Sequence, residues 1–304
     1  MGDRLTHLLV LAVVAAGGLL GLQARINGEL GARLHSAVDA ALLSFGVGTT
    51  LLLVVVAIGH RDGVRRLRAT TVRWWWWLGG LAGAALVAST AEGVPQVGVA
   101  LVSVCIVAGT AVGALVVDGA GLGPGGRRAV DGLRLGGAVL AVGAVALGAV
   151  GDDGSAVRPA LLLVLFASGA ASALQQAANG QLRRVSASAS VAALASFLGG
   201  TLALVVIAGA RGDLAGRSLP GEWWLYLGGL LGAIYIALAA ASVQPLGVLR
   251  LSLATVAGQL LGGVILDLVW PAPGIELKVT TVIGAALTLV AVGVVGARRT
   301  SVQP

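Results

Sequence analysis

The chain has 304 residues, of which 57% are hydrophobic and 11% are charged, and its mean hydropathy is +0.96. These values exclude an ordinary soluble globular domain and indicate an integral membrane protein. The net charge of +7 does not indicate a nucleic-acid partner, because nearly all the basic residues lie in short segments between apolar stretches.

Ten apolar stretches are each about as long as a membrane-spanning helix, which needs about 20 residues to cross a hydrocarbon core about 30 Å thick. The predicted fold class is therefore an all-α integral membrane protein with ten transmembrane helices. Pro95 and Pro245 are expected to begin the fourth and ninth helices, where a missing N–H costs little. The stretches are residues 6–27, 37–59, 74–92, 96–117, 132–150, 157–180, 188–210, 222–242, 246–268 and 279–297.

The basic residues of the loops predict the orientation in a bacterial-type cytoplasmic (inner) membrane. With the N-terminus in the cytoplasm, 13 basic residues fall on the cytoplasmic side and 6 on the other, which favours both termini in the cytoplasm. Arg25 and Arg33 are assigned to the external side in this scheme. The most basic segment, residues 60–73, precedes four tryptophans, a combination typical of an anchor at the membrane interface.

One unit occurs twice in the chain. Residues 22–30 (LQARINGEL) return as residues 174–182 (LQQAANGQL), 152 residues later. We predict a first five-helix repeat in residues 1–152 and a second in residues 153–304. Because five is odd, the second repeat enters the membrane from the opposite side, which is the inverted-repeat arrangement of many transporters. Three further strings recur: residues 44–49 at 196–201, 77–84 at 226–233, and 107–118 at 256–267.

Glycines four residues apart occur in register in the two repeats. Small residues at this spacing form a flat helix face that allows a second backbone to approach closely. We therefore expect these GxxxG pairs to form the tightly packed inner helices. The pairs are Gly79 and Gly83, Gly109 and Gly113, Gly228 and Gly232, and Gly258 and Gly262.

Two pairs of amides are the first candidates for substrate binding, because polar side chains inside a membrane span are costly without a role. Gln23 and Asn27 share one helix face, and Gln175 and Asn179 repeat that face with Gln176 beside them. Amides both donate and accept hydrogen bonds, which suits a neutral or zwitterionic solute. The alternative, that the amides only cross-link helices, stays open.

A second group of polar and aromatic residues could line the same cavity. Thr110 and Gln259 occupy equivalent positions in the two repeats, and Tyr235 lies within the predicted eighth span. Trp77 and Tyr226 are equivalent and are expected to lie deepest in their aromatic runs. Core packing or interface anchoring is the alternative role of these aromatic residues.

Four charged residues near the predicted span ends are candidate gate or rim residues. Asp118 and Asp267 end the fourth and ninth spans, and Glu92 ends the third. Arg250 lies about one turn inside the ninth span, from where it could reach outward or pair with Asp118. For both aspartates the alternative is simple solvation at the rim.

Catalytic and metal-binding patterns are absent from the sequence. It contains no HExxH, GxSxG or Walker A motif, its three histidines lie near the N-terminal end, and Cys105 is the only cysteine. We therefore expect neither enzymatic activity nor a cofactor or metal ion. The expected partners are a small-molecule substrate and the lipid bilayer, with a monomer or a homodimer as the assembly.

The repeated motifs resemble the YdcZ-like branch of the drug/metabolite transporter superfamily over essentially the whole chain. Each unit contains Q-x-x-x-N-G-x-L, then SF-x-x-G-T, then a W/Y-LGG string and finally VAG-x-x-x-G before an aspartate. The chain resembles two five-helix proteins of this branch fused together. The resemblance implies the inverted-repeat fold of EamA-like permeases, with a central cavity lined mainly by the first, third, fourth, sixth, eighth and ninth helices.

The second repeat departs from the first in its charges. Ala177 and Gln181 replace Arg25 and Glu29, and Arg250 has no charged counterpart in the first repeat. A function carried by these charges is therefore expected to be asymmetric. The sequence predicts an exporter of a small metabolite or drug that works by alternating access, and the alternative is a non-transporting membrane scaffold or accessory subunit.

Overall fold

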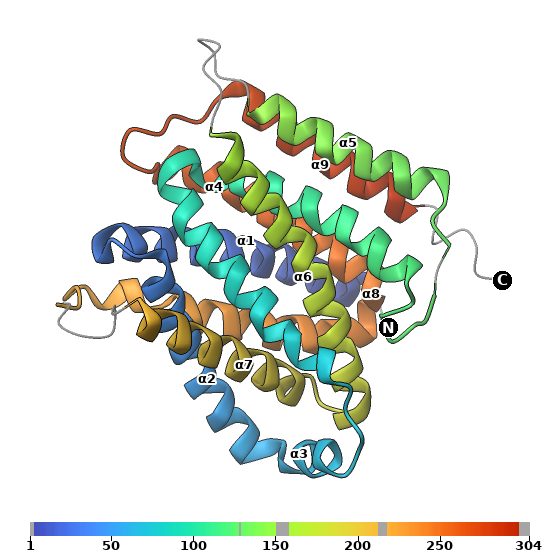
Figure 1. Ribbon diagram of the computed structural model, residues 1–304. Coiled ribbons are helices and arrows are strands. Elements are labelled where there is room, and N and C mark those ends of the chain that lie inside the picture. The colour runs from blue at the N-terminus through green and yellow to red at the C-terminus, as the bar shows by residue number, and fades with distance from the viewer. Residues whose placement is uncertain (1–2, 128, 150–157, 212–217, 298–304) are drawn as a thin grey trace.

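The computed structural model describes residues 3–127, 129–149, 158–211 and 218–297. Within these ranges the regular structure is helical and contains no strand, so the predicted all-α class is confirmed. The elements (Figure 1) are α1 (Asp3–Leu34), α2 (Ala37–Gly59), α3 (Arg61–Arg68), η1 (Trp74–Leu78), α4 (Gly79–Gly119), α5 (Gly132–Gly148), α6 (Pro159–Ser186), α7 (Ala189–Ala210), η2 (Trp223–Tyr226), α8 (Gly228–Val269) and α9 (Val279–Ala297).

Five helical segments of the described chain are long and apolar enough to cross a membrane. The longest, Trp74–Gly119, has 46 residues and contains both the third and the fourth predicted spans. The other four are His7–Leu34, Ala37–Gly59, Pro159–Ser186 and Ala189–Ala210. Three shorter apolar helices are Gly132–Gly148, Leu253–Val269 and Val279–Ala291.

α4 changes direction at Gly98, which separates the helix into two arms (Figure 1). Gly98 has φ +80° and ψ 167°, a conformation that a residue with a Cβ rarely adopts. The prediction that Pro95 begins the fourth helix is wrong, because the first arm continues through Pro95 to Val97. Proline removes one helical hydrogen bond, but the positive φ of glycine redirects the chain.

The turns after α1 and α6 are built alike at equivalent positions. His35 and Ala187 adopt left-handed conformations with φ 52° and 53°. Ser36 and Ser188 follow them, and each serine hydroxyl accepts a hydrogen bond from the backbone N–H three residues later. These serine caps explain why α2 and α7 begin where they do.

Each first helix of a repeat packs against the long helix of the other repeat, so that α1 lies against α8 and α6 lies against α4. A Cβ on Gly109 would overlap the Phe166 carbonyl oxygen, and a Cβ on the equivalent Gly258 would overlap the Val14 carbonyl oxygen. Glycine is therefore required for this backbone approach. The predicted tight packing of the GxxxG pairs is confirmed.

α2 and α7 contact each other through equivalent residues. The Phe45 and Phe197 rings stack with their centroids 4.9 Å apart. The Thr49 and Thr201 hydroxyls are hydrogen-bonded at 2.8 Å, and these two threonines are 152 residues apart in the chain. The same positions of the two repeats therefore meet at this interface.

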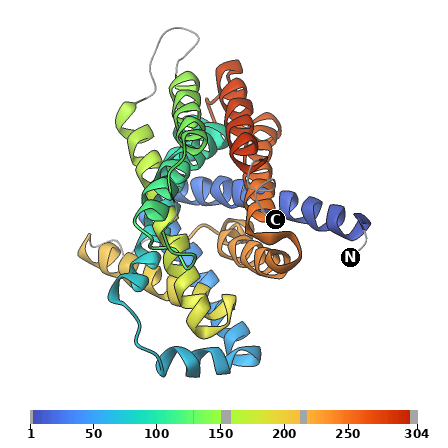
Figure 2. The same ribbon diagram turned by 90° about the vertical axis from the view of Figure 1, so that its right-hand side faces the viewer.

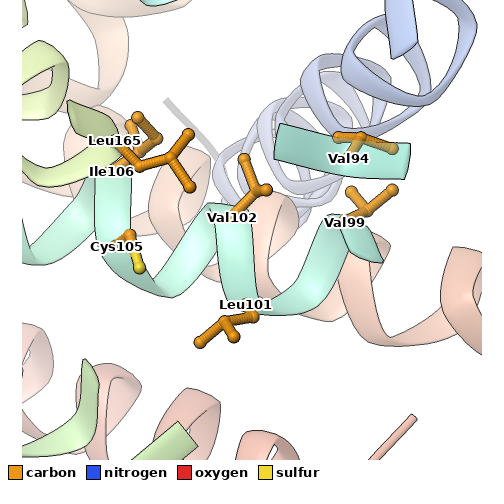
Figure 3. Close-up of a cluster of buried hydrophobic side chains, with 7 residues drawn as sticks. All are labelled: Val94, Val99, Leu101, Val102, Cys105, Ile106 and Leu165. Atoms are coloured by element: carbon orange, nitrogen blue, oxygen red, sulfur yellow. The ribbon is translucent and has the colours of Figure 1, made fainter. Parts of the chain in front are cut away.

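α5 and α9 lie side by side at one edge of the bundle (Figures 1 and 2). The largest buried apolar cluster surrounds the break in α4 and includes Val94 from the first arm, Val99 and Cys105 from the second arm, and Leu165 from α6 (Figure 3). This cluster fixes the second arm of α4 against α6. It thereby positions the Val99 and Ala100 N–H groups, which meet the Asp267 carboxylate at the break.

Candidate functional site

The amide pair of α1 faces the GxxxG pair of α8. Asn27 is 1% exposed, and its Nδ2 donates a hydrogen bond to Ser44 Oγ at 3.3 Å. A Cβ on Gly228 would overlap Asn27 Oδ1, and a Cβ on Gly232 would lie 3.1 Å from Gln23 Nε2. Both amides therefore occupy space that only glycine leaves open.

The amide pair of α6 has the same relation to α4. Gln175 Nε2 donates a hydrogen bond to Ser196 Oγ at 3.2 Å, and a Cβ on Gly83 would overlap that amide nitrogen. A Cβ on Gly79 would lie 3.5 Å from Asn179 Oδ1. Each amide pair thus contacts a serine of its own repeat and a GxxxG pair of the other repeat. The amide that binds the serine is asparagine in the first repeat and glutamine in the second.

One acceptor in each amide pair makes no hydrogen bond within the described protein. These atoms are Asn27 Oδ1 and Asn179 Oδ1, and both are buried. A buried carbonyl oxygen without a donor is costly, and each of these atoms keeps the capacity to accept a hydrogen bond. Gln176, beside Gln175, is exposed and lies on another side of α6.

The second group of predicted cavity residues is distributed among several interfaces. Thr110 Oγ1 lies 2.8 Å from Ile106 O, 3.0 Å from Gly169 O and 2.9 Å from Ser172 Oγ, so it joins α4 to α6. Gln259 is half-buried at the α1–α8 interface, where its backbone approaches Gly17.

The aromatic candidates lie at three other places. Tyr235 is half-buried beside Thr255. The Tyr226 hydroxyl donates a hydrogen bond to Pro220 O at 2.7 Å. Trp77 is 45% exposed, and the buried tryptophan of its run is Trp76. The expectation that Trp77 lies deepest in the run is therefore wrong, because the 3₁₀ turn points its neighbour inward.

Asp267 is buried at the break in α4. It is 7% exposed, and its two carboxylate oxygens accept hydrogen bonds from Val99 N at 2.8 Å and Ala100 N at 2.7 Å. The carboxylate thus caps the second arm of α4, whose first N–H groups carry partial positive charge. Rim solvation of Asp267 is wrong, since this acid lies near the end of α8, in the second repeat, and caps a helix of the first repeat.

Arg25 is a buried charge whose setting the sequence did not indicate. It is 2% exposed, its Nη2 donates a hydrogen bond to Pro271 O at 2.8 Å, and its guanidinium lies 5.1 Å from the Trp270 ring centroid. Its Nε makes no hydrogen bond, and its charge interacts with that of Asp267. Arg25 therefore lies buried within α1 and not in a loop, and its assignment to the external side of the membrane stays a prediction.

Asp118 has a different partner from its repeat equivalent Asp267. Arg134, at the start of α5, forms an ion pair with Asp118; the Asp118 side chain is partly exposed and that of Arg134 is largely buried. Arg250 lies within α8, but its side chain is outside the described part of the structure. Its suggested pairing with Asp118 therefore stays a prediction.

The remaining charged candidates lie at the surface. Glu92 is exposed, and its carboxylate accepts a hydrogen bond from Gln96 Nε2 at 2.8 Å. Arg33 bridges Glu29, at 3.0 Å, and Glu222. Among the described residues no three His, Cys, Asp or Glu side chains gather in a metal-binding arrangement.

Comparison with known proteins gives a match in both halves of the chain. Residues 8–147 and 160–294 each match the family model described as "Putative inner membrane exporter, YdcZ". A solved structure described as "Crystal structure of protein" is similar over 100% of both chains, with a TM-score of 0.54 and 19% sequence identity, which shows a shared fold. No curated protein matches the chain.

Proposed function

The chain belongs to the YdcZ family of the drug/metabolite transporter superfamily, and from this premise we propose that it exports a small metabolite or drug by alternating access of two inverted repeats. It is a multi-pass inner membrane protein of a family of exporters, not of enzymes.

Reciprocal contacts between the repeats support a two-fold relation. Gly80 packs against the backbone of Ser196 and Gly200, and Gly229 packs against the backbone of Ser44 and Gly48. Equivalent residues therefore exchange partners, while residues close to the axis, such as the two hydrogen-bonded threonines of α2 and α7, meet their own counterparts. An axis between α2 and α7 explains both kinds of contact.

In this arrangement the two arms of α4 and two segments of α8 supply four of ten spans. The repeats are residues 1–152 and 153–304, and each buries its first helix in the other. Both termini lie in the cytoplasm. Rocking about the α2–α7 contact would then expose the amide pairs to one side of the membrane at a time.

The observation that carries the proposal is the equivalent setting of the two amide pairs. Each pair lies between a serine of its own repeat and two glycines of the other, and each retains a buried acceptor without a donor. The two pairs form half-sites where the repeats meet. Their amide chemistry suits a neutral or zwitterionic solute that carries hydrogen-bond donors.

Removing both glutamine amides, with Gln23→Ala and Gln175→Ala together, is expected to lower transport about tenfold or more. Each lost hydrogen bond is worth about 0.5–1.5 kcal/mol, and the two losses act on one bound solute. Purified protein in liposomes, tested with a broad panel of metabolites and drugs, gives the measurement. Gln176→Ala removes the same group from the exposed side of α6 and should change the rate less than twofold.

A protein that moves no member of the panel, with the amides intact and with them removed, would contradict the transporter proposal. It would favour the non-transporting scaffold or accessory subunit, in which the amides serve only to join helices. Transport that is equally insensitive to both sets of changes would instead place the substrate site elsewhere in the chain.

A further inference from the structure

A group of exposed arginines gathers at one end of the bundle and comes from both repeats. α3 lies across this end, beside the last turns of α2 and α6 (Figures 1 and 2). All seven side chains are exposed. We call the group the arginine patch, and its members are Arg61, Arg65, Arg66, Arg68, Arg73, Arg183 and Arg184.

Packing of α3 against the α6–α7 junction brings these residues together. Gly63 is buried there, and a Cβ on it would lie 3.0 Å from Val191 Cγ2 and 3.1 Å from both Ser186 O and Ser188 Cβ. Leu67 packs in the apolar cluster that contains Trp76 and Leu182. The patch is therefore held on a folded surface, although its two parts lie more than 100 residues apart in the chain.

Little negative charge offsets the patch. Asp62 is the one acidic residue of α3, and its carboxylate lies 3.2 Å from Arg65 Nη1. Both side chains are more than four-fifths exposed, so water and salt screen this pair strongly. Among the described residues no ion pair to the other six arginines is formed.

The tryptophan run adjoining the patch fixes its depth relative to the bilayer. Trp74 is 74% exposed and follows Arg73 directly, while Trp76 is buried in the protein. Exposed tryptophan is typical of the headgroup region of a membrane, where phosphate groups are concentrated. Arginine binds phosphate oxygens with its planar fork of N–H groups, so charge and depth both point to lipid headgroups.

We propose that the arginine patch binds the phosphate groups of anionic phospholipids of the phosphatidylglycerol type. This site is separate from the amide pairs and does not depend on the transported substrate. Arg65, Arg66 and Arg68 of α3 supply contacts from the first repeat, and Arg183 and Arg184 supply contacts from the second. Bound lipid thus joins the two repeats at this end of the bundle.

The test is a titration of the purified full-length protein in neutral detergent with phosphatidylglycerol or phosphatidylcholine, with binding followed by thermophoresis. The intact protein should bind phosphatidylglycerol at least tenfold more tightly. The triple variant R65Q/R66Q/R68Q should lose this preference. Its affinity for phosphatidylglycerol should fall about fivefold for each arginine removed. The triple variant R158Q/R211Q/K278Q removes the same charge from residues outside the patch and should keep the preference.

Three results would overturn the proposal. They are a preference that survives in R65Q/R66Q/R68Q, equal binding of both lipids by the intact protein, and a preference lost equally in the two triple variants. Displacement of the lipid by millimolar inorganic phosphate would assign the patch to a soluble anion instead. Because the changed side chains are exposed, except for the half-buried Lys278, both variants should melt like the intact protein in lipid-free detergent, and none of these results bears on export.

Discussion

Gly258→Val is expected to prevent assembly of the native bundle. A Cβ at this position would overlap the Val14 carbonyl oxygen, which belongs to the backbone of α1 and cannot move aside like a side chain. Overpacking of a well-packed interior costs about 1–3 kcal/mol where side chains can adjust, and more is expected where backbone must shift. Yield of monodisperse protein and its thermal unfolding in detergent measure the effect.

Gly136→Val is the matched control, because it makes the same chemical change within the helix α5. Nothing lies within 4 Å of a Cβ built on Gly136, and the residue is exposed. This variant should assemble like the intact chain. Equal stability of Gly258→Val and Gly136→Val would show that α1 and α8 do not approach as closely as described.

Asp267→Ala is expected to destabilise the fold by about 2–4 kcal/mol. The change leaves the Val99 and Ala100 N–H groups buried without an acceptor, and each such loss costs about 1–3 kcal/mol. It also removes one of the two acids, Glu29 and Asp267, whose charges act on the buried guanidinium of Arg25. Thermal unfolding gives the stability, and alkylation of Val94→Cys in a Cys105→Ala background reports opening at the break.

Asp118→Ala provides the comparison for this prediction, since Asp118 is the repeat equivalent of Asp267. The Asp118 side chain is partly exposed, so water can replace the lost carboxylate. The cost should therefore be well under that of Asp267→Ala, without increased alkylation at position 94. If the two variants melted at the same temperature, the capping role of Asp267 would be wrong.

Features repeated along the chain could be predicted from the sequence. The amide pairs and the GxxxG pairs recur at fixed spacing, and each motif describes one face of one helix. The sequence did not show that these two faces meet each other. Gly228 contacts Asn27 because α8 packs on α1, and this pairing depends on how the two repeats interlock.

Charged residues at span ends were the part that sequence reasoning placed wrongly. The count of basic residues placed Arg25 on the external side, and nothing in the sequence indicated that its side chain is buried. Its hydrogen-bond acceptor, Pro271 O, lies 246 residues away in the chain. The partners of Asp267 are similarly remote, and they are backbone N–H groups, which no side-chain pattern reveals.

The exchange of first helices between the repeats has a consequence for biosynthesis. The ribosome completes Asn27 about 200 residues before Gly228, and at about 5–20 residues per second this interval lasts about 10–40 s. During this time α1 resides in the bilayer with its amides facing lipid or neighbouring incomplete segments. A nascent chain of this protein therefore depends on its own last third to complete its first helix, and the insertion machinery has to retain the early segments until then.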